Sequence, residues 1–301
     1  MIHRQNKIDI RKIQRSIINE MGHIDEEYVS IQDKDAIFER HCVYDGQYDD
    51  AHAISEKVIS MIESGSKSEV MDWEFKNLKG LDRLSISVNA MPNQKANATS
   101  EISGSTLALE VSAPLYDEIS SIDISRWKEQ VEAAITHELS HAKIESEQGP
   151  TDEDGFSEIS EKIIYSQSIV NDYRYKFILM SYFCYYHEIQ SYVSQIPPEI
   201  NAIIGGKERV SAEDLLAALK KTSVYKTYLW AKAVLLQNIK SFDAEMIEAV
   251  ANEYGKYNTD IGNDIKANFP KYLHYFEEKI EFAFRKIRQV FNYVLEEYGV
   301  L

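Results

Sequence analysis

Apolar residues recur at helical spacing over most of this chain. In the stretch 49–64, Ile54, Val58 and Ile62 fall on one face, and Gly65 stands where such a helix would end. The stretch 5–20 has the same period. Beyond residue 124 the pattern predicts a largely helical remainder, with helices at 125–145, 157–195, 211–221, 224–239, 243–253 and 272–298.

A different period marks the region between residues 70 and 114. Leu84, Ile86 and Val88 alternate with polar residues, and a second alternating run, 107–111, follows a stretch rich in Asn, Ser and Gly. Strict alternation is typical of strands with one buried face. The two runs therefore predict two strands in a helix-rich α+β fold.

Interruptions in the helical pattern suggest how the chain is organised. An acidic loop at 145–155 and the pair Pro197-Pro198, followed by Gly205 and Gly206, indicate two hinges. Both are too short to be flexible interdomain linkers. We expect an N-terminal helical region at 1–68, a core region at 69–196 and a C-terminal helical region at 197–301.

Composition and charge narrow the class of protein. Among the 301 residues, 49 are acidic and 33 are basic, and a net charge of −16 repels phosphate backbones, so nucleic acid is not an expected partner. The two cysteines, Cys42 and Cys184, lie far apart and indicate neither a disulfide framework nor a cysteine-based metal site. No apolar run resembles a secretory signal or a membrane span, so we expect a cytoplasmic protein without a membrane partner. Its oligomeric state stays open.

One short segment carries recognisable chemistry. His137, Glu138 and His141 form the pattern H-E-x-x-H within a predicted helix, which puts the two imidazoles one turn apart on the same face. Zinc accepts nitrogen and oxygen ligands at about 2.0–2.2 Å, and two imidazoles at this spacing can reach one ion. The carboxylate of Glu138 could take a proton from a metal-activated water, which is an arrangement typical of hydrolysis.

The surroundings of this motif favour a metal site over surface histidines. Trp127, Val131, Ile135 and Leu139 form an apolar stripe that would bury the helix. Buried imidazoles and carboxylates need a partner, because desolvation without one costs several kcal/mol.

A third ligand must come from elsewhere in the chain. Glu188 is the best candidate, because it is the single acidic residue in the aromatic segment 185–192, and buried carboxylates are usually paired or bound to metal. His187 is the first alternative and Asp172 the second. An exposed Glu188 without a ligand role also stays open.

On these residues the chain resembles the zincin metallopeptidases, and within them the gluzincins, in which two helix histidines and a glutamate from a later helix bind zinc. The likeness covers roughly residues 83–195, where strand, motif helix, acidic loop and third-ligand helix follow in the same order. It implies a zincin-like fold with a small antiparallel sheet beside the motif helix, zinc on His137, His141 and Glu188, and Glu138 as catalytic base. It also implies that an edge strand at 107–111 holds an extended substrate.

Two departures from the zincin patterns leave the peptidase subgroup open. Ile144 and Glu147 stand where metzincins have a glycine and a third histidine, and Tyr192 stands where thermolysin-like enzymes have an aspartate. The donor for the oxyanion is open as well, among Tyr185, Tyr186, His187 and Tyr192.

The expected function is that of a zinc metallopeptidase, a hydrolase that cleaves a protein or peptide substrate, and the acidic surface favours a basic substrate. The alternative is a non-catalytic helical interaction or structural protein that retains a zincin-like metal site. A non-peptidase metal hydrolase is a third reading. The intact set of His137, Glu138 and His141 favours an enzyme, because zincin-like domains without turnover often lose the base.

Overall fold

The computed structural model describes residues 46–76, 78–90, 97–113, 124–148, 155–166, 172–205 and 210–300. The predicted helix at 5–20 and Cys42 lie outside these ranges. Contacts divide the chain into two compact units, Met1–Gly149 with Gln190–Thr222 and Arg288–Leu301, and Pro150–Ile189 with Ser223–Ile287. These units are defined by contacts and do not test the three regions expected from the sequence. The regions 1–68, 69–196 and 197–301 therefore stay a prediction.

The first unit contains a four-stranded sheet with the strand order β1-β2-β4-β3. The pairs β1–β2 and β3–β4 are antiparallel, whereas β2 and β4 run parallel. The α+β class is confirmed, but the purely antiparallel sheet is wrong, because β4 turns back from β3 at Gly104 and inserts between β3 and β2. The strands span Ser68–Asp72 (β1), Arg83–Ala90 (β2), Asn97–Ser103 (β3) and Thr106–Ala113 (β4).

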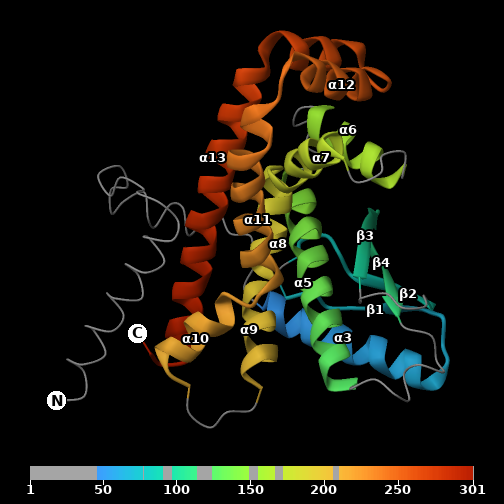
Figure 1. Ribbon diagram of the computed structural model, residues 1–301. Helices are drawn as coiled ribbons and strands as arrows, with labels where there is room; N and C mark the ends of the chain where they lie inside the picture. Colours follow the sequence, from blue (N-terminus) through green and yellow to red (C-terminus); the bar gives the residue numbers. More distant parts are fainter. Residues whose placement is uncertain are drawn as a thin grey trace. The chain divides into compact units, whose positions relative to one another are not determined.

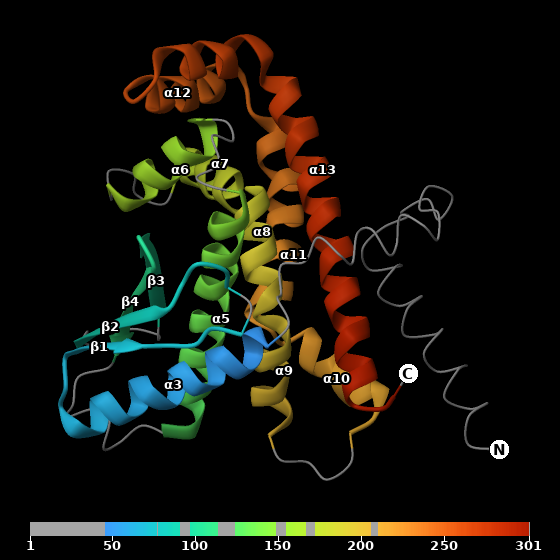
Figure 2. The same cartoon turned by 180° about the vertical axis from the view of Figure 1, so that it is seen from behind.

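Two helices pack with this sheet and form the core of the first unit. Helix α3 (Gln47–Ser64) contacts both β2 and α5 (Ile124–Gln148), and α5 also contacts β3 and β4 (Figures 1 and 2). Helix α3 ends as predicted, because Gly65 takes the left-handed conformation, with φ at 72°. The apolar faces meet in one buried cluster that includes Ile54, Val58, Leu84, Ile86, Leu107, Leu109, Val131, Ile135 and Leu139.

Helices α9 (Ile196–Ile204) and α10 (Ala212–Leu219) also belong to the first unit, where α9 contacts α5 and α10. The proline pair expected to mark a hinge lies in the first turn of α9, directly after the junction with α8. A helix tolerates proline there because its first amides have no intrahelical acceptor. Gly205 then ends α9 in the left-handed conformation, with φ at 43°.

The described residues of the second unit form helices joined by short turns. The predicted helix 157–195 is divided into α6 (Gly155–Tyr165), α7 (Tyr173–Phe183) and α8 (Tyr186–Ser194), and the last of these continues into the first unit. The further helices are α11 (Ser223–Gln237), the short 3-10 helix η2 (Ile239–Ser241), α12 (Ala244–Gly255) and α13 (Thr259–Glu297).

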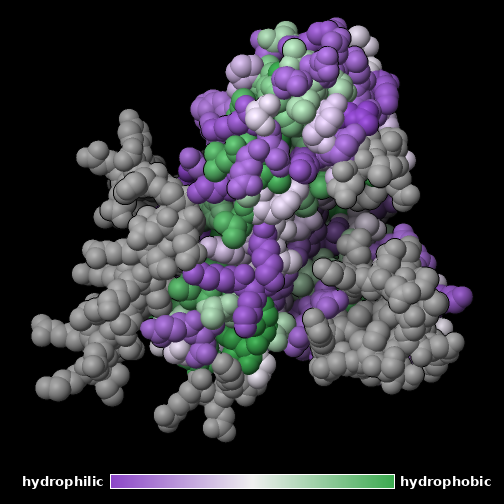
Figure 3. Space-filling view, in the orientation of Figure 1, coloured by the Kyte–Doolittle hydropathy of each residue, from purple (hydrophilic) through white to green (hydrophobic). Residues whose placement is uncertain are grey.

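Aromatic side chains fill the interior of the second unit. Phe177 and Phe276 are fully buried and stack edge to face, with ring centroids 5.2 Å apart, and Tyr254 packs against Phe177 at 6.0 Å. The outer face of α12 is exposed, and Figure 3 shows hydrophilic residues with scattered apolar ones over this helix. No helix within the described ranges is both long enough and apolar enough to cross a membrane.

Candidate metal centre

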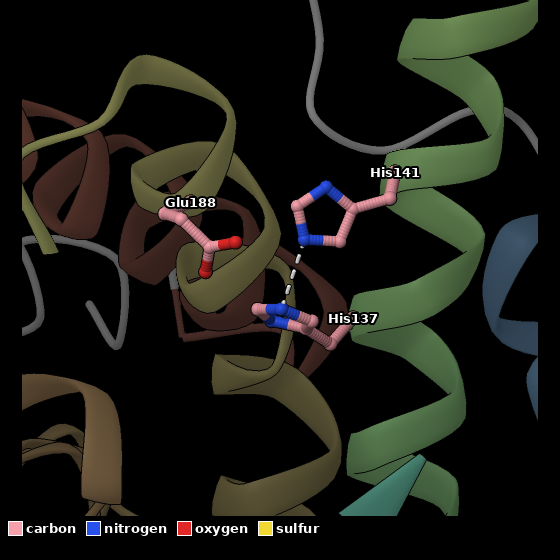
Figure 4. A group of neighbouring side chains, drawn as sticks. All are labelled: His137, His141 and Glu188. Carbon is pink, nitrogen blue, oxygen red and sulfur yellow. Dashed lines mark hydrogen bonds between the residues drawn. The ribbon is translucent and has the colours of Figure 1, made fainter. Parts of the chain in front are cut away.

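Helix α5 places the two histidines of the motif side by side. Nε2 of His137 lies 3.0 Å from Nε2 of His141, and the two rings meet edge to face with centroids 4.7 Å apart (Figure 4). Ile135 and Leu139, which are fully buried in the core against the sheet, fix the rotation of the helix. His137 is 9% exposed and His141 is half-buried. Spacing and amphipathicity together therefore produce the histidine pair.

Glu188 completes a group of three possible metal ligands. It lies in the first turn of α8, is 7% exposed, and directs its carboxylate toward both imidazoles (Figure 4). One ligand atom from each of His137, His141 and Glu188 lies within 4.8 Å of the others. Glu188 and Gln190 lie on the same helix, α8. From Gln190 onward this helix belongs to the first unit, which also contains α5.

The donor set fits a metal ion. Two nitrogens and a carboxylate oxygen are ligands that zinc and similar divalent ions accept, and donors around a tetrahedral zinc ion lie about 3.4 Å apart. The ligand atoms of the group all lie within 4.8 Å of one another, which is near this spacing. A buried carboxylate that faces two imidazoles is also an arrangement that a cation stabilises strongly. Within the part of the chain that the structure describes, this is the one such group.

Two residues at the C-terminal end of α8 and at its junction with α9 contact the ring of His137. Nε2 of the side-chain amide of Gln195 lies 2.7 Å from Nδ1 of His137, and the ring of Tyr192 meets the imidazole edge to face with centroids 4.9 Å apart. Gln195 was not among the residues predicted from sequence. Its one local signal is its position just before the proline pair, which does not reveal a contact with the motif helix.

A buried network of hydrogen bonds joins α5 to α3 and α8. The side chain of Gln47, at the start of α3, is fully buried and donates hydrogen bonds to the carbonyl of Thr136 at 2.9 Å and to Oγ of Ser140 at 2.7 Å. Ser140 in turn lies 2.9 Å from Oγ of Ser194 on α8. The network therefore links α3, α5 and α8 directly beside the motif, and sequence periodicity gave no indication of it.

Glu138 lies between the histidines and the sheet. It is half-buried, and its Oε2 accepts a hydrogen bond from Oγ of Ser100 on β3 at 2.6 Å. The edge strand predicted at 107–111 is wrong, because β4 has β2 on one side and β3 on the other. Among the described strands, β3 is the edge strand that contacts α5, and its mostly polar sequence lacks the alternation that marks β2 and β4.

The alternative ligands have other roles. Asp172 caps α7 by accepting hydrogen bonds from the amides of Arg174 and Tyr175. Burial raises the pKa of Asp172, but the hydrogen bonds from Arg174 and Tyr175 outweigh it and hold the pKa below its usual value. His187 is buried with its ring 5.1 Å from that of Tyr185, outside the group of ligands. Cys184 is buried as well, and burial raises the pKa of its thiol.

Comparisons of the chain with protein-family models, with curated proteins and with solved structures gave no match. The assignment of this site therefore depends on the residues and their geometry.

Proposed function

We propose that this protein is a zinc-dependent metallopeptidase with the gluzincin arrangement of ligands. The observation that carries the proposal is the convergence of His137, His141 and Glu188, with the carboxylate of Glu138 next to them on the same helix. The ligand set, two nitrogens and one oxygen, leaves a tetrahedral ion one further position for water or substrate, as catalytic zinc sites require.

Each residue then has a defined role. Zinc, when bound, polarises the scissile carbonyl and lowers the pKa of a water molecule. Glu138 takes the proton of the attacking water and passes it to the leaving amine. Ser100 holds Glu138 by a hydrogen bond from its hydroxyl to Oε2. Tyr192 is the strongest candidate to donate to the oxyanion, because its ring already contacts His137.

The substrate would bind in an extended conformation along β3. This strand is at the edge of the sheet, so the side of its backbone away from β4 can pair with a peptide. Its residues Thr99 and Glu101 are exposed, and Ser100 between them touches the base. The net charge of −16 favours a basic protein or peptide substrate, and we propose that it is met in the cytoplasm.

Replacement of Glu138 by glutamine tests the enzymatic role. The amide keeps size and hydrogen bonding but cannot take a proton, so zinc content and melting temperature should match the wild type while hydrolysis of a mixed peptide library falls at least ~100-fold. Equal hydrolysis by both proteins would refute the role of Glu138. Loss of zinc from the variant would indicate a structural role for this carboxylate instead.

A cleavage comparison in cell lysates separates the enzyme from its alternative. Zinc-loaded wild type and Glu138→Gln are incubated with bacterial and phage lysates, and new protein termini are counted. We expect termini that appear with the wild type alone. Their complete absence would favour a non-catalytic interaction or structural protein that retains the metal site.

A further inference from the structure

We propose that Gln195 is a positioning residue that fixes His137 in the tautomer able to bind metal. The proposal rests on the metal centre proposed above and extends it to a residue outside the ligand set. It starts from one contact, the 2.7 Å between Nε2 of the side-chain amide of Gln195 and Nδ1 of His137.

The backbone holds Gln195 in place at the junction of α8 and α9. Its amide donates to the carbonyl of Tyr192 at 3.1 Å, and its carbonyl accepts from the amide of Glu199 at 3.1 Å. The proline pair that follows restricts the backbone of the first turn of α9. Next to it, Ser194 ties the junction to α5 through the 2.9 Å contact with Ser140. The side chain of Gln195 therefore starts from a fixed point on the same framework as His137.

The chemistry of imidazole decides which end of the amide must face the ring. A neutral imidazole has one N–H and one lone pair, and binding through Nε2 requires the proton on Nδ1. With its oxygen toward the ring, Gln195 accepts this Nδ1 proton and leaves the Nε2 lone pair for the metal. With its nitrogen toward the ring, it would donate to Nδ1 and force the proton onto Nε2. In the structure the amide nitrogen faces Nδ1; a rotation of the amide by about 180° exchanges nitrogen and oxygen at this position, and metal binding through Nε2 requires the oxygen toward the ring.

The direction of the ring agrees with this assignment. Nε2 of His137 is the atom that faces His141, at 3.0 Å, while Nδ1 faces the junction (Figure 4). The edge-to-face contact with Tyr192 limits rotation of the ring away from this position. His137 is thus oriented by contacts on two sides before any metal binds, and such orientation strengthens metal sites.

Two substitutions at position 195 test this role by zinc affinity, measured by competition with a chromophoric chelator. Gln195→Glu keeps an acceptor for the Nδ1 proton, so its dissociation constant should stay within a few-fold of the wild type. Gln195→Leu removes the acceptor at similar size and should weaken binding about 10- to 100-fold. Gln237→Leu, at an exposed position of α11, is the matched control and should bind zinc like the wild type.

Ring ¹⁵N spectra of metal-free wild type give a second readout that needs no variant. We expect the Nδ1–H tautomer for His137. The Nε2–H tautomer, or equal zinc affinity of Gln195→Leu and the wild type, would overturn the proposal, as would a loss for Gln195→Glu as large as that for Gln195→Leu. His137→Ala distinguishes failure of the metal centre from failure of the role of Gln195. If His137→Ala loses zinc while Gln195→Leu does not, the metal centre is supported and the role of Gln195 is refuted.

Discussion

Oγ of Ser100, on the edge strand β3, donates a 2.6 Å hydrogen bond to Oε2 of Glu138 on α5. The bond joins the open edge of the sheet to the acidic residue of the H-E-x-x-H motif. It also fixes the rotamer of Glu138, because one of the two carboxylate oxygens is held by a strand that is itself paired with β4.

Removal of this hydroxyl should impair hydrolysis and leave the metal in place. A hydrogen bond to a charged group contributes about 1.5–3 kcal/mol, so Ser100→Ala should lower kcat/KM for a peptide substrate roughly 10-fold or more. Ser100→Thr retains the hydroxyl and should keep most of the activity. Zinc content should not change, since Ser100 is not a ligand.

The matched control for this prediction is Ser103→Ala, at an exposed position of the same strand. It should leave peptide hydrolysis unaltered. Full activity in Ser100→Ala would show that the hydrogen bond plays no part in turnover.

The third ligand can be assigned by comparing two adjacent residues of α8. Glu188→Ala should weaken zinc binding by orders of magnitude, because it removes a coordinating oxygen, whereas His187→Ala should bind zinc nearly as tightly as the wild type. Chelator competition measures both dissociation constants. If His187→Ala releases zinc and Glu188→Ala retains it, the assignment of Glu188 is wrong.

Asp172 should contribute to stability without contributing to metal binding. As the N-cap of α7, it should make Asp172→Ala less stable by about 1 kcal/mol near pH 7, with zinc content unchanged. The folded-state pKa of Asp172 is lowered, so this stabilisation is present above the ordinary aspartate pKa and is lost as the pH falls through the folded value.

Urea unfolding of wild type and Asp172→Ala at neutral and at acid pH checks both parts of this prediction. The difference in the free energy of unfolding should shrink as the pH falls below the ordinary pKa of aspartate. A difference that stays constant with pH would contradict an electrostatic contribution from the cap, and loss of zinc from the variant would return Asp172 to the list of ligands.

The parts of the fold that could be predicted are those whose burial follows a local period. Helix α3 and strands β2 and β4 show one apolar face at regular spacing, and all three were found. Strand β1 was missed because Val70 is 56% exposed, and β3 because its sequence is almost entirely polar. Both exist through pairing with a neighbouring strand, which a local pattern does not contain.

Helix ends were harder to predict than helix faces. The apolar period continues from 157 to 195, yet the cap at Asp172 and the turn at Cys184 divide this stretch into three helices. Helix α13 begins at Thr259, well before the predicted residue 272, and passes Pro270 with a non-helical residue at Asn268. Proline removes an amide donor, and a long amphipathic helix can absorb this loss with a local kink.

The candidate site also contains residues that the local sequence predicts and residues that it does not. His137 and His141 are predictable from a spacing of four, and Glu188 from a lone carboxylate among aromatic residues. Ser100 and Gln195 are ordinary polar residues in sequence, and their contacts with Glu138 and His137 depend on how β3 and the junction before α9 pack against α5. Local sequence therefore predicts the candidate ligands, whereas their contacts with Ser100 and Gln195 require the tertiary structure.

The most direct test of the account is the zinc content of protein purified without added metal, measured by elemental analysis in the wild type, His137→Ala and His141→Ala. We predict close to one zinc per wild-type chain and almost none in either variant, with Asp172→Ala as a zinc-binding control. Equal zinc content in the wild type and both histidine variants would contradict a metal centre at His137, His141 and Glu188.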